Sequence, residues 1–248
     1  ASPLDLRRER LIDVLRVDPA PVTLVCAPAG SGKTSLLAGW AAQSPDRTIA
    51  WLTLDRHDND PGRLWLGLIE ALRATEVFPS DSPLHELHAP ADEVDPGFVD
   101  ALLHEVASVG EPLWIVLDDV HALWHRRAIA SLEVLLQRAP SNLHLVISAR
   151  AEPAVGLPRL RVLGAVRELR SRELAFTLEE TAELVRRHEV GFSTADVEVL
   201  HARTDGWAAG LQIACMAVAG GEDPGSFVAR FDGDDHEVAD YLLTEVMA

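Results

Sequence analysis

The stretch from Ala27 to Leu36, APAGSGKTSL, constrains the fold more than any other part of the sequence. It follows the apolar run PVTLVC and precedes a run with a helical pattern, and the letters GSGKT match the end of a phosphate-binding loop. The pattern begins with glycine, whereas this chain has Ala27, which adds only one methyl group at the loop entrance. A strand before the loop and a helix after it favour a working loop over an accidental turn of small residues.

Such a loop binds phosphate mainly through its backbone. Successive N–H groups point inward and form a nest for the β- and γ-phosphates of a nucleotide, and the following helix adds its positive N-terminal end. Lys33 is expected to act catalytically as a positive charge on the terminal phosphates, and the Thr34 hydroxyl is an expected Mg²⁺ ligand. The residues expected to bind the nucleotide here are Ala27, Pro28, Ala29, Gly30, Ser31, Gly32, Lys33, Thr34 and Ser35.

A pair of acidic residues follows a second apolar run, LWIVL. Asp118 is expected to hold Mg²⁺ through a water, and Asp119 is expected to orient or deprotonate the attacking water. Aspartate at a strand end is also common in turns and helix caps, but after a phosphate-binding loop at this distance it indicates nucleotide hydrolysis. Fast ATPases of this class commonly have the longer Glu at the second position, so Asp119 predicts slow hydrolysis.

A third expected catalytic side chain is Arg150, which closes the segment VISAR and would emerge at the carboxyl end of a strand. Ligands of open α/β sheets bind at this edge, which is also the edge of the phosphate-binding loop. The guanidinium is therefore expected to contact the γ-phosphate and to report whether it is present. A surface arginine in an ion pair is the alternative interpretation.

Short apolar runs alternate with helical stretches up to about Arg170. Continuously apolar runs belong to strands covered on both faces, and their alternation with helices predicts a parallel α/β sheet. The expected strands span residues 21–26, 48–54, 113–117, 143–148 and 165–169. The segment from Phe78 to Pro96 is rich in Pro, Asp, Ser and His and is expected to be a long surface loop. Core packing is expected for Trp51, Trp65, Trp114 and Trp124.

Beyond the α/β part the sequence has only helical patterns. Thr177 with Glu180 forms a capping box before one helix, and Ser193 begins a second. The last expected helix is DDHEVADYLLTEVM, close to the end of the chain. The sequence therefore predicts a P-loop nucleotide-binding domain over residues 1–172 and a small all-α domain over residues 173–248.

The charge balance excludes some functions for this chain. Its 22 basic and 39 acidic side chains give a formal net charge of −17, which argues against nucleic-acid binding, because a phosphate backbone requires dense Lys and Arg. Cys26 and Cys215 lie in apolar runs and are expected to be buried free thiols. The sequence has no signal-peptide pattern and no apolar run long enough for a membrane span, so we expect a cytoplasmic protein without membrane contact. It starts at Ala1 and stops in mid-pattern, which indicates a fragment of a longer protein.

Together these features resemble the STAND class of P-loop switch ATPases and, more narrowly, the MalT-like regulators, which are large ATP-binding proteins of the LuxR type. The matching segments run through essentially the whole chain: RRERL, APAGSGKTSLLAGWA, WLTLDRHDNDPGRLWLGLIEAL, LWIVLDDVHAL, LHLVISARAEP, ELAFTLEE, TDGWAAGLQIACMAV and VADYLLTEV. Ala27 in place of glycine is ordinary in that family. The resemblance implies a P-loop NTPase fold with a five-stranded parallel sheet in the order 5-1-4-3-2, helices on both of its faces, and a helical lid domain that folds over the nucleotide.

The resemblance also implies where the adenine is bound. The segment DGWAAGL stands where related ATPases have a Gly-x-Pro contact to adenine. Because Ala208 replaces the proline, the contact is expected from Gly206 or Trp207. The segment from Leu6 to Arg10 is expected beside the adenine, with Arg8 as the best single candidate.

The function implied is a switch that uses ATP/ADP and Mg²⁺, with Arg150 as the sensor arginine. ADP would hold a resting form, ATP with an inducer would favour a form that associates into homo-oligomers, and slow ATP hydrolysis would reset the switch. A small-molecule or protein inducer would act through a C-terminal sensor, and DNA would be bound only through a helix-turn-helix, both outside this sequence. The alternatives are the NTPase module of a regulatory protein kinase, a continuously cycling ATPase, and a scaffold that holds ADP permanently.

Overall fold

The computed structural model describes residues 8–17, 19–91 and 94–231. The helix expected from Asp234 to Met247 lies outside these residues, and so do Leu6 and Arg7 of the segment expected beside the adenine. Within the described ranges, none of the helices is both long enough and apolar enough for a membrane span.

By its internal contacts the chain divides into two compact units. The sheet unit comprises residues 15–26 and 41–169, and the loop–helical unit comprises residues 1–14, 27–40 and 170–248. The second unit is therefore discontinuous in sequence, and it contains the phosphate-binding loop together with the C-terminal helices. The division expected after residue 172 stays a prediction.

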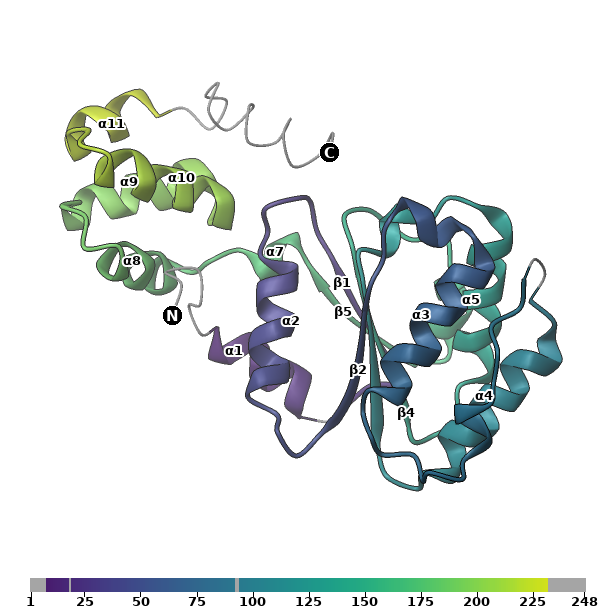
Figure 1. Cartoon of the computed structure of the whole chain (residues 1–248). Coiled ribbons are helices and arrows are strands. Elements are labelled where there is room, and N and C mark those ends of the chain that lie inside the picture. Colours follow the sequence, from purple (N-terminus) through teal and green to yellow (C-terminus); the bar gives the residue numbers. More distant parts are fainter. Residues whose placement is uncertain (1–7, 18, 92–93, 232–248) are drawn as a thin grey trace. The chain divides into compact units, whose positions relative to one another are not determined.

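A five-stranded sheet forms the centre of the sheet unit (Figure 1). Its strands are ordered β2-β3-β4-β1-β5, which is the expected order read from the opposite edge. The pairs β1–β4, β2–β3 and β3–β4 are parallel. The strands are β1 Val22–Cys26, β2 Thr48–Thr53, β3 Leu113–Asp118, β4 Leu143–Ala149 and β5 Val166–Arg170. The α/β sheet and the strand order predicted from the sequence are confirmed.

The sheet is buried because its central strands are apolar on both sides. Every residue of β1 and β3 is buried. Figure 1 shows α3 and α5 along one face of the sheet, with α4 packed next to α5, and their leucines join the strand residues in one core. The helices of this unit are α3 Pro61–Arg73, α4 Pro96–Ser108, α5 Arg126–Arg138 and α6 Leu157–Val162, with 3-10 turns η1 Arg56–Asn59, η2 Pro83–His85 and η3 Val120–Ala122.

Two of the remaining helices, α8 and α9, begin where the sequence places their caps. Thr177 Oγ1 accepts a hydrogen bond from the N–H of Glu180 at 3.2 Å, and the Glu180 carboxylate accepts one from the N–H of Thr177 at 3.0 Å. Ser193 caps α9 in the same way. Helix α11 was not expected from the sequence; it begins after Asp223, whose carboxylate accepts from the N–H of Ser226. The remaining helices are α1 Glu9–Arg16, α2 Lys33–Ala42, α7 Ser171–Leu174, α8 Leu178–Arg187, α9 Thr194–Thr204, α10 Ala208–Ala219 and α11 Pro224–Arg230.

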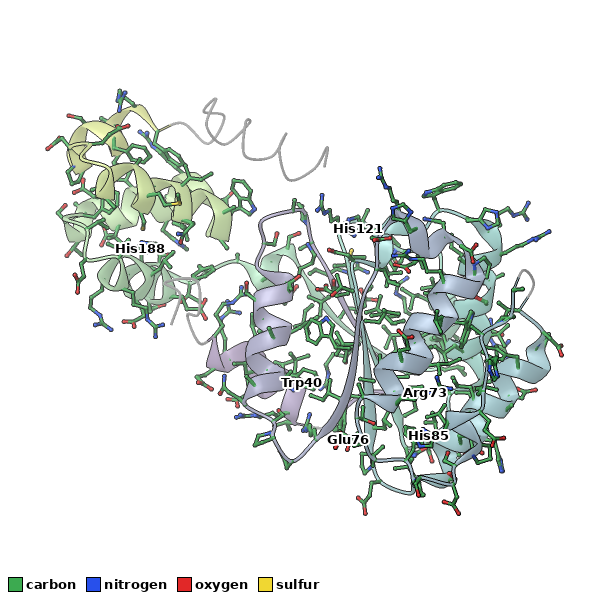
Figure 2. The ribbon with its side chains drawn as sticks, viewed as in Figure 1. Trp40, Arg73, Glu76, His85, His121 and His188 are labelled. Atoms are coloured by element: carbon green, nitrogen blue, oxygen red, sulfur yellow. The ribbon has the colours of Figure 1, made fainter. Side chains whose placement is uncertain are left out.

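The segment expected as a surface loop after α3 is pinned to the sheet unit. The Arg73 guanidinium donates hydrogen bonds of 2.9–3.2 Å to the carbonyl oxygens of three loop residues, Leu84, His85 and Leu87. Phe78 and Leu84 are buried in the core of the unit. Figure 2 shows Arg73 and His85 near one another at the end of α3. The polar composition of the segment therefore did not reveal its two buried apolar residues, and its cationic partner, Arg73, belongs to α3.

The expectations on burial hold for most of the residues concerned. Cys26 and Cys215 are buried free thiols, and burial raises the pKa of the Cys215 thiol to about 12. Trp65 and Trp114 are buried as expected. Trp124 is 71% exposed, so the core position predicted for it is wrong. It lies in the connection between η3 and α5, where neither helical nor strand periodicity determines which way a side chain points.

Candidate functional site

The phosphate-binding loop runs from Ala27 to Gly32, directly after β1, and α2 begins at Lys33. Gly30 and Gly32 have φ angles of 71° and 75°, in the left-handed region that glycine adopts without steric cost. The Lys33 ammonium donates hydrogen bonds to the carbonyl oxygens of Ala27 at 2.9 Å and Pro28 at 3.1 Å, and Lys33 is only 7% exposed. The lysine is thus held inside the curve of the loop, as in a phosphate nest.

The start of α10 is fastened to this loop by two hydrogen bonds. The indole Nε1 of Trp207 donates to the carbonyl oxygen of Ala29 at 3.1 Å, and the N–H of Ala209 donates to the carbonyl oxygen of Gly30 at 3.0 Å. A Cβ on Gly30 would lie 2.5 Å from the Cβ of Ala209 and 2.9 Å from the Trp207 ring. Gly30 is therefore required both by its backbone conformation and by the close approach of α10.

Arg8 is a buried cation, 4% exposed, that bridges the loop and α7. Its guanidinium donates to the carbonyl oxygens of Leu174 at 2.7 Å and Gly32 at 2.9 Å, and it lies over the Phe176 ring, 5.1 Å from the centroid. Burial lowers the pKa of this guanidinium to about 10, which leaves it charged at neutral pH. Arg8 thus holds the backbone of the phosphate-binding loop, and the adenine contact expected for it stays a prediction.

A pocket of about 160 Å³ opens beside the loop, within the same unit. Its lining is mainly apolar with a few hydroxyl groups and one carboxylate, a composition that suits a flat heterocyclic ligand. Trp207, for which the sequence predicts an adenine contact, lines this pocket, whereas the contribution of Ser171 and Leu174 in α7 was not predicted. The lining residues are Pro28, Ser31, Ser171, Leu174, Ala175, Thr204, Asp205, Trp207 and Ala208.

Gly206, the other expected adenine contact, does not line this pocket. Its carbonyl oxygen accepts a hydrogen bond from the N–H of Phe176 at 2.8 Å. A Cβ at Gly206 would lie 2.3 Å from the Phe176 carbonyl oxygen. Gly206 therefore lets the connection between α9 and α10 lie against the segment before α8, while Trp207 next to it forms part of the pocket wall.

The acidic pair lies at the end of β3, in the sheet unit. Asp118 is fully buried, and the Ser148 hydroxyl in β4 donates a hydrogen bond to its Oδ1 atom. The N–H of Asp119 donates to Ser148 Oγ at 3.0 Å and to Asp118 Oδ1 at 3.1 Å. Asp119 has a φ of 60°, and its Oδ1 atom lies 3.5 Å from Nδ1 of His121. The sequence did not predict the role of Ser148, because a serine inside an apolar strand does not show which residue of the neighbouring strand it contacts.

The three strands that precede the expected catalytic residues end at one edge of the sheet. β4 lies between β3 and β1, and the register pairs Cys26 with Ala149 and Leu117 with Ile147. The chain continues from β1 into the phosphate-binding loop, from β3 into the acidic pair, and from β4 into Arg150. This is the edge at which ligands of α/β sheets bind. The role of Arg150 toward a phosphate stays a prediction.

The donors expected to bind Mg²⁺ are a hydroxyl and a carboxylate, which are the hard oxygen ligands that this ion prefers. Thr34 and its neighbour Ser35 are exposed in the first turn of α2, and Asp118 ends β3. Among the described residues, no group of three or more His, Cys, Asp or Glu is placed to hold a metal ion. The Mg²⁺ roles of Thr34 and Asp118 stay predictions.

Comparisons with known proteins agree with this architecture. No protein-family model matches the chain. It is 30% identical over 246 residues to the serine/threonine-protein kinase PknK of Mycobacterium tuberculosis, covering 97% of this chain and 22% of PknK. It is 31% identical over 231 residues to the HTH-type transcriptional regulator MalT of Serratia proteamaculans, covering 91% of this chain and 25% of MalT. The chain thus spans about a quarter of the length of these relatives.

Among solved structures, a Walker-type ATPase of Pyrococcus abyssi superposes with a TM-score of 0.65 at 16% identity, over 98% of this chain and 74% of that one. A likeness at this identity concerns the fold. The parallel sheet in the order β2-β3-β4-β1-β5 and the loop after β1 agree with it. The chain therefore has the fold of the P-loop ATPases, and over nearly all of its length it is a homologue of segments of the MalT regulators and of PknK.

Proposed function

We propose that this chain is a nucleotide-dependent switch module that binds ATP or ADP with Mg²⁺ and hydrolyses ATP slowly. The observation that carries the proposal is the phosphate-binding loop, in which the carbonyl oxygens of Ala27 and Pro28 hold the Lys33 ammonium. The Walker-type ATPase with the same fold supports nucleotide binding. The homologue MalT is a transcriptional regulator by name, which supports a regulatory role for nucleotide binding.

In the proposed complex, the phosphates lie on the N–H groups of the loop, next to Lys33 and the N-terminal end of α2. The base enters the pocket beside the loop. There Trp207 supplies an aromatic wall, while the Asp205 carboxylate and the Ser171 hydroxyl supply polar groups for the ring edge. Trp207 thus contacts both the base and the loop, through its hydrogen bond to Ala29.

For hydrolysis, Thr34 and Asp118 would hold Mg²⁺, the latter through a water, and the bound ion would neutralise charge on the phosphates. Ser148 fixes the orientation of the Asp118 carboxylate by its hydrogen bond. Asp119 orients or deprotonates the attacking water, and Arg150 contacts the γ-phosphate. The short Asp119 side chain makes hydrolysis slow, which suits a regulatory switch better than a continuously cycling ATPase.

The helices of the loop–helical unit are the proposed bistable element. Trp207, Ala209 and Arg8 donate hydrogen bonds directly to carbonyl oxygens of the phosphate-binding loop. If the loop backbone shifts when ATP replaces ADP, these hydrogen bonds carry the shift directly to α10 and α7. In the proposed cycle, ADP stabilises the resting form, ATP favours a form that self-associates, and hydrolysis resets it.

The remaining parts of the proposal concern a larger cytoplasmic protein. MalT is described as an HTH-type regulator, and this chain spans only a quarter of it. A small-molecule or protein inducer would act through a C-terminal sensor, and DNA would be bound through a helix-turn-helix, both outside this sequence. The match to PknK supports a second candidate, the same switch attached to a protein kinase. The proposed role of this chain is the same for both candidates.

The first prediction tests the nucleotide itself. Purified chain that is denatured should release about one equivalent of ADP, and Lys33→Ala should release none, because the loop loses its only ammonium. Chromatography of the released nucleotide measures both. Wild-type chain that is empty and also fails to bind added Mg-ATP would contradict the proposal. ADP that never exchanges for ATP would instead indicate a permanently loaded scaffold.

A second readout uses the composition of the chain. Lys33 is the only lysine in the sequence, so an amine-selective reagent modifies this side chain and the N-terminal amine alone. In chain from which bound nucleotide has been removed, ATP at ten times its Kd lowers the free fraction to about one tenth, and the modification of Lys33 should slow accordingly. The N-terminal amine is the internal control and should react at an unchanged rate, as measured by mass spectrometry of the peptides.

A further inference from the structure

Asn59, the last residue of η1, is 8% exposed and has both ends of its amide group paired. Its Nδ2 donates to the carbonyl oxygens of Arg56 at 3.0 Å and Ala122 at 2.8 Å. Its Oδ1 accepts from the backbone N–H groups of Trp124 and His125, both at 2.7 Å. One side chain thus joins the turn after β2 to the connection between β3 and α5, which lies more than sixty residues further along the chain.

That connection begins with the acidic pair. Asp119 is followed by η3, and its carbonyl oxygen accepts a hydrogen bond from the N–H of Ala122 at 2.9 Å. Asp119 has a left-handed backbone, which is uncommon for a residue with a side chain, and its turn is held at both ends. Ser148 holds the N–H at the start of this turn, and Asn59 holds the carbonyl oxygen and two N–H groups at its end.

The segment that carries Asn59 is itself well held. Asp55 and Asp58 form a capping box across η1, in which the N–H of Asp55 donates to Asp58 Oδ2 at 2.7 Å. Asp58 Oδ1 lies 3.5 Å from the guanidinium of Arg63 in the first turn of α3. The turn η1, which carries Asn59, is therefore fixed to α3. Through its hydrogen bonds the Asn59 amide also restrains the turn beyond Asp119.

We propose that Asn59 is a positioning residue for the Asp119 turn. It contacts no reacting atom; it fixes the backbone that sets the direction of the Asp119 carboxylate and of His121, whose ring nitrogen lies 3.5 Å from that carboxylate. Figure 2 shows His121 at the end of the sheet unit opposite to Arg73 and His85. The inference rests on the proposed hydrolysis of ATP and adds the group that pre-organises its water-positioning residue.

Only a primary amide has the required donors and acceptors together. Asn59→Ala removes all four hydrogen bonds. Asn59→Asp keeps an acceptor for the N–H groups of Trp124 and His125 but cannot donate to the Ala122 carbonyl oxygen. The two variants therefore separate the two ends of the amide.

Asn142 offers a matched control. It is a second loop-bridging asparagine of the same unit, and its Nδ2 donates to the carbonyl oxygens of Val106 at 2.9 Å and Glu111 at 3.3 Å. It precedes β4, so it lies at the amino end of that strand, away from the acidic pair. Asn142→Ala removes two hydrogen bonds of the same kind and therefore reports the effect of loosening a loop that lies away from the acidic pair.

The test compares single-turnover hydrolysis of Mg-ATP, ADP affinity and thermal stability in the full chain and the three variants. We expect Asn59→Ala to lower the hydrolysis rate about tenfold or more, with ADP affinity within about twofold of wild type. Asn142→Ala should leave the rate within about twofold at a temperature where both variants are folded. Hydrogen exchange gives a readout apart from activity: the amides of Trp124 and His125 should lose protection in Asn59→Ala and keep it in Asn59→Asp.

Two results separate the inference from the function on which it rests. If wild-type chain hydrolyses ATP and folded Asn59→Ala hydrolyses it equally fast, the positioning role is wrong and the proposed function stands. If folded wild-type chain binds Mg-ATP but never hydrolyses it, the proposed ATPase activity falls, and the positioning role falls with it. If Asn59→Ala does not fold, the rate of Asn59→Asp decides, because loss of the Ala122 contact alone should also slow hydrolysis.

Discussion

At the scale of single residues, the phosphate-binding loop depends on donors that pair the carbonyl oxygens of its backbone. Carbonyl oxygens need hydrogen-bond partners when they are buried. The Lys33 ammonium, the Arg8 guanidinium, the Trp207 indole and the Ala209 N–H supply these partners. The carbonyl oxygens that accept these hydrogen bonds belong to Ala27, Pro28, Ala29, Gly30 and Gly32.

A substitution at Gly30 tests whether this packing matters. Gly30→Ala should destabilise the chain by about 2–4 kcal/mol, because its φ is left-handed and the new Cβ overlaps the Cβ of Ala209. The control is Gly39→Ala in α2, where an added Cβ meets nothing within 4 Å and should stabilise the helix by about 0.5–1 kcal/mol. Urea unfolding measures both. Equal effects of the two substitutions would show that α10 does not press on the loop as the structure has it.

Residues of this kind set the limit of what the sequence predicts. The spacing in GSGKT is local, so the loop between β1 and α2 could be predicted from the sequence alone. The roles of Lys33 and Thr34 toward a nucleotide stay predictions. Arg8 donates to Leu174, 166 residues away, and Asn59 accepts from the N–H of His125, 66 residues away. Such partners are brought together by the tertiary fold, and no local sequence pattern around Arg8 or Asn59 predicts them.

At the scale of elements, apolar runs and caps predicted the sheet and most helices, because both signals lie within a few neighbouring residues. Helix α11 was missed although Asp223-Pro224 is a common helix start. The segment after α3 is a largely exposed surface loop, as expected, but its polar composition gave no sign that Phe78 and Leu84 enter the core. Composition describes the average of a segment, whereas its path is set by the few side chains that enter the core.

Arg73 is the cation that anchors this segment, and its removal gives the prediction at this scale. Arg73→Ala should destabilise the sheet unit by about 1–3 kcal/mol, since three carbonyl oxygens lose a charged donor. Arg127→Ala, at an exposed position in the first turn of α5, is the control and should change stability by less than about 0.5 kcal/mol. Thermal unfolding followed by circular dichroism compares them. A similar change in both variants would mean that Phe78 and Leu84 hold the segment without help from Arg73.

At the scale of the whole molecule, the strand patterns of the sequence end near residue 170, and the domain boundary predicted after residue 172 stays a prediction. The contacts of the structure group residues 27–40 with residues 170–248 in one compact unit. A pattern that is read along the sequence does not show this grouping, because the contacts that define it join the loop to helices much later in the chain.

The last prediction concerns a fragment that ends at residue 172. It contains the whole sheet unit, Arg8 and the phosphate-binding loop, but it lacks Trp207 and Ala209, which donate to the loop. At about 1 kcal/mol for each hydrogen bond, the loss of these two corresponds to about thirtyfold weaker ADP binding than in the full chain. Fluorescence titration with a labelled ADP measures the difference.

The near-ultraviolet circular dichroism of the buried Trp65 and Trp114 reports whether the sheet unit of the fragment is folded. Trp207→Phe in the full chain is the matched variant: it removes one loop donor, keeps an aromatic wall, and should weaken ADP binding by about fivefold to tenfold. A folded fragment that binds ADP as tightly as the full chain would place the nucleotide site wholly before residue 173. It would also mean that the helices after residue 172 do not sense the nucleotide directly, because their contacts with the loop would not contribute to ADP binding.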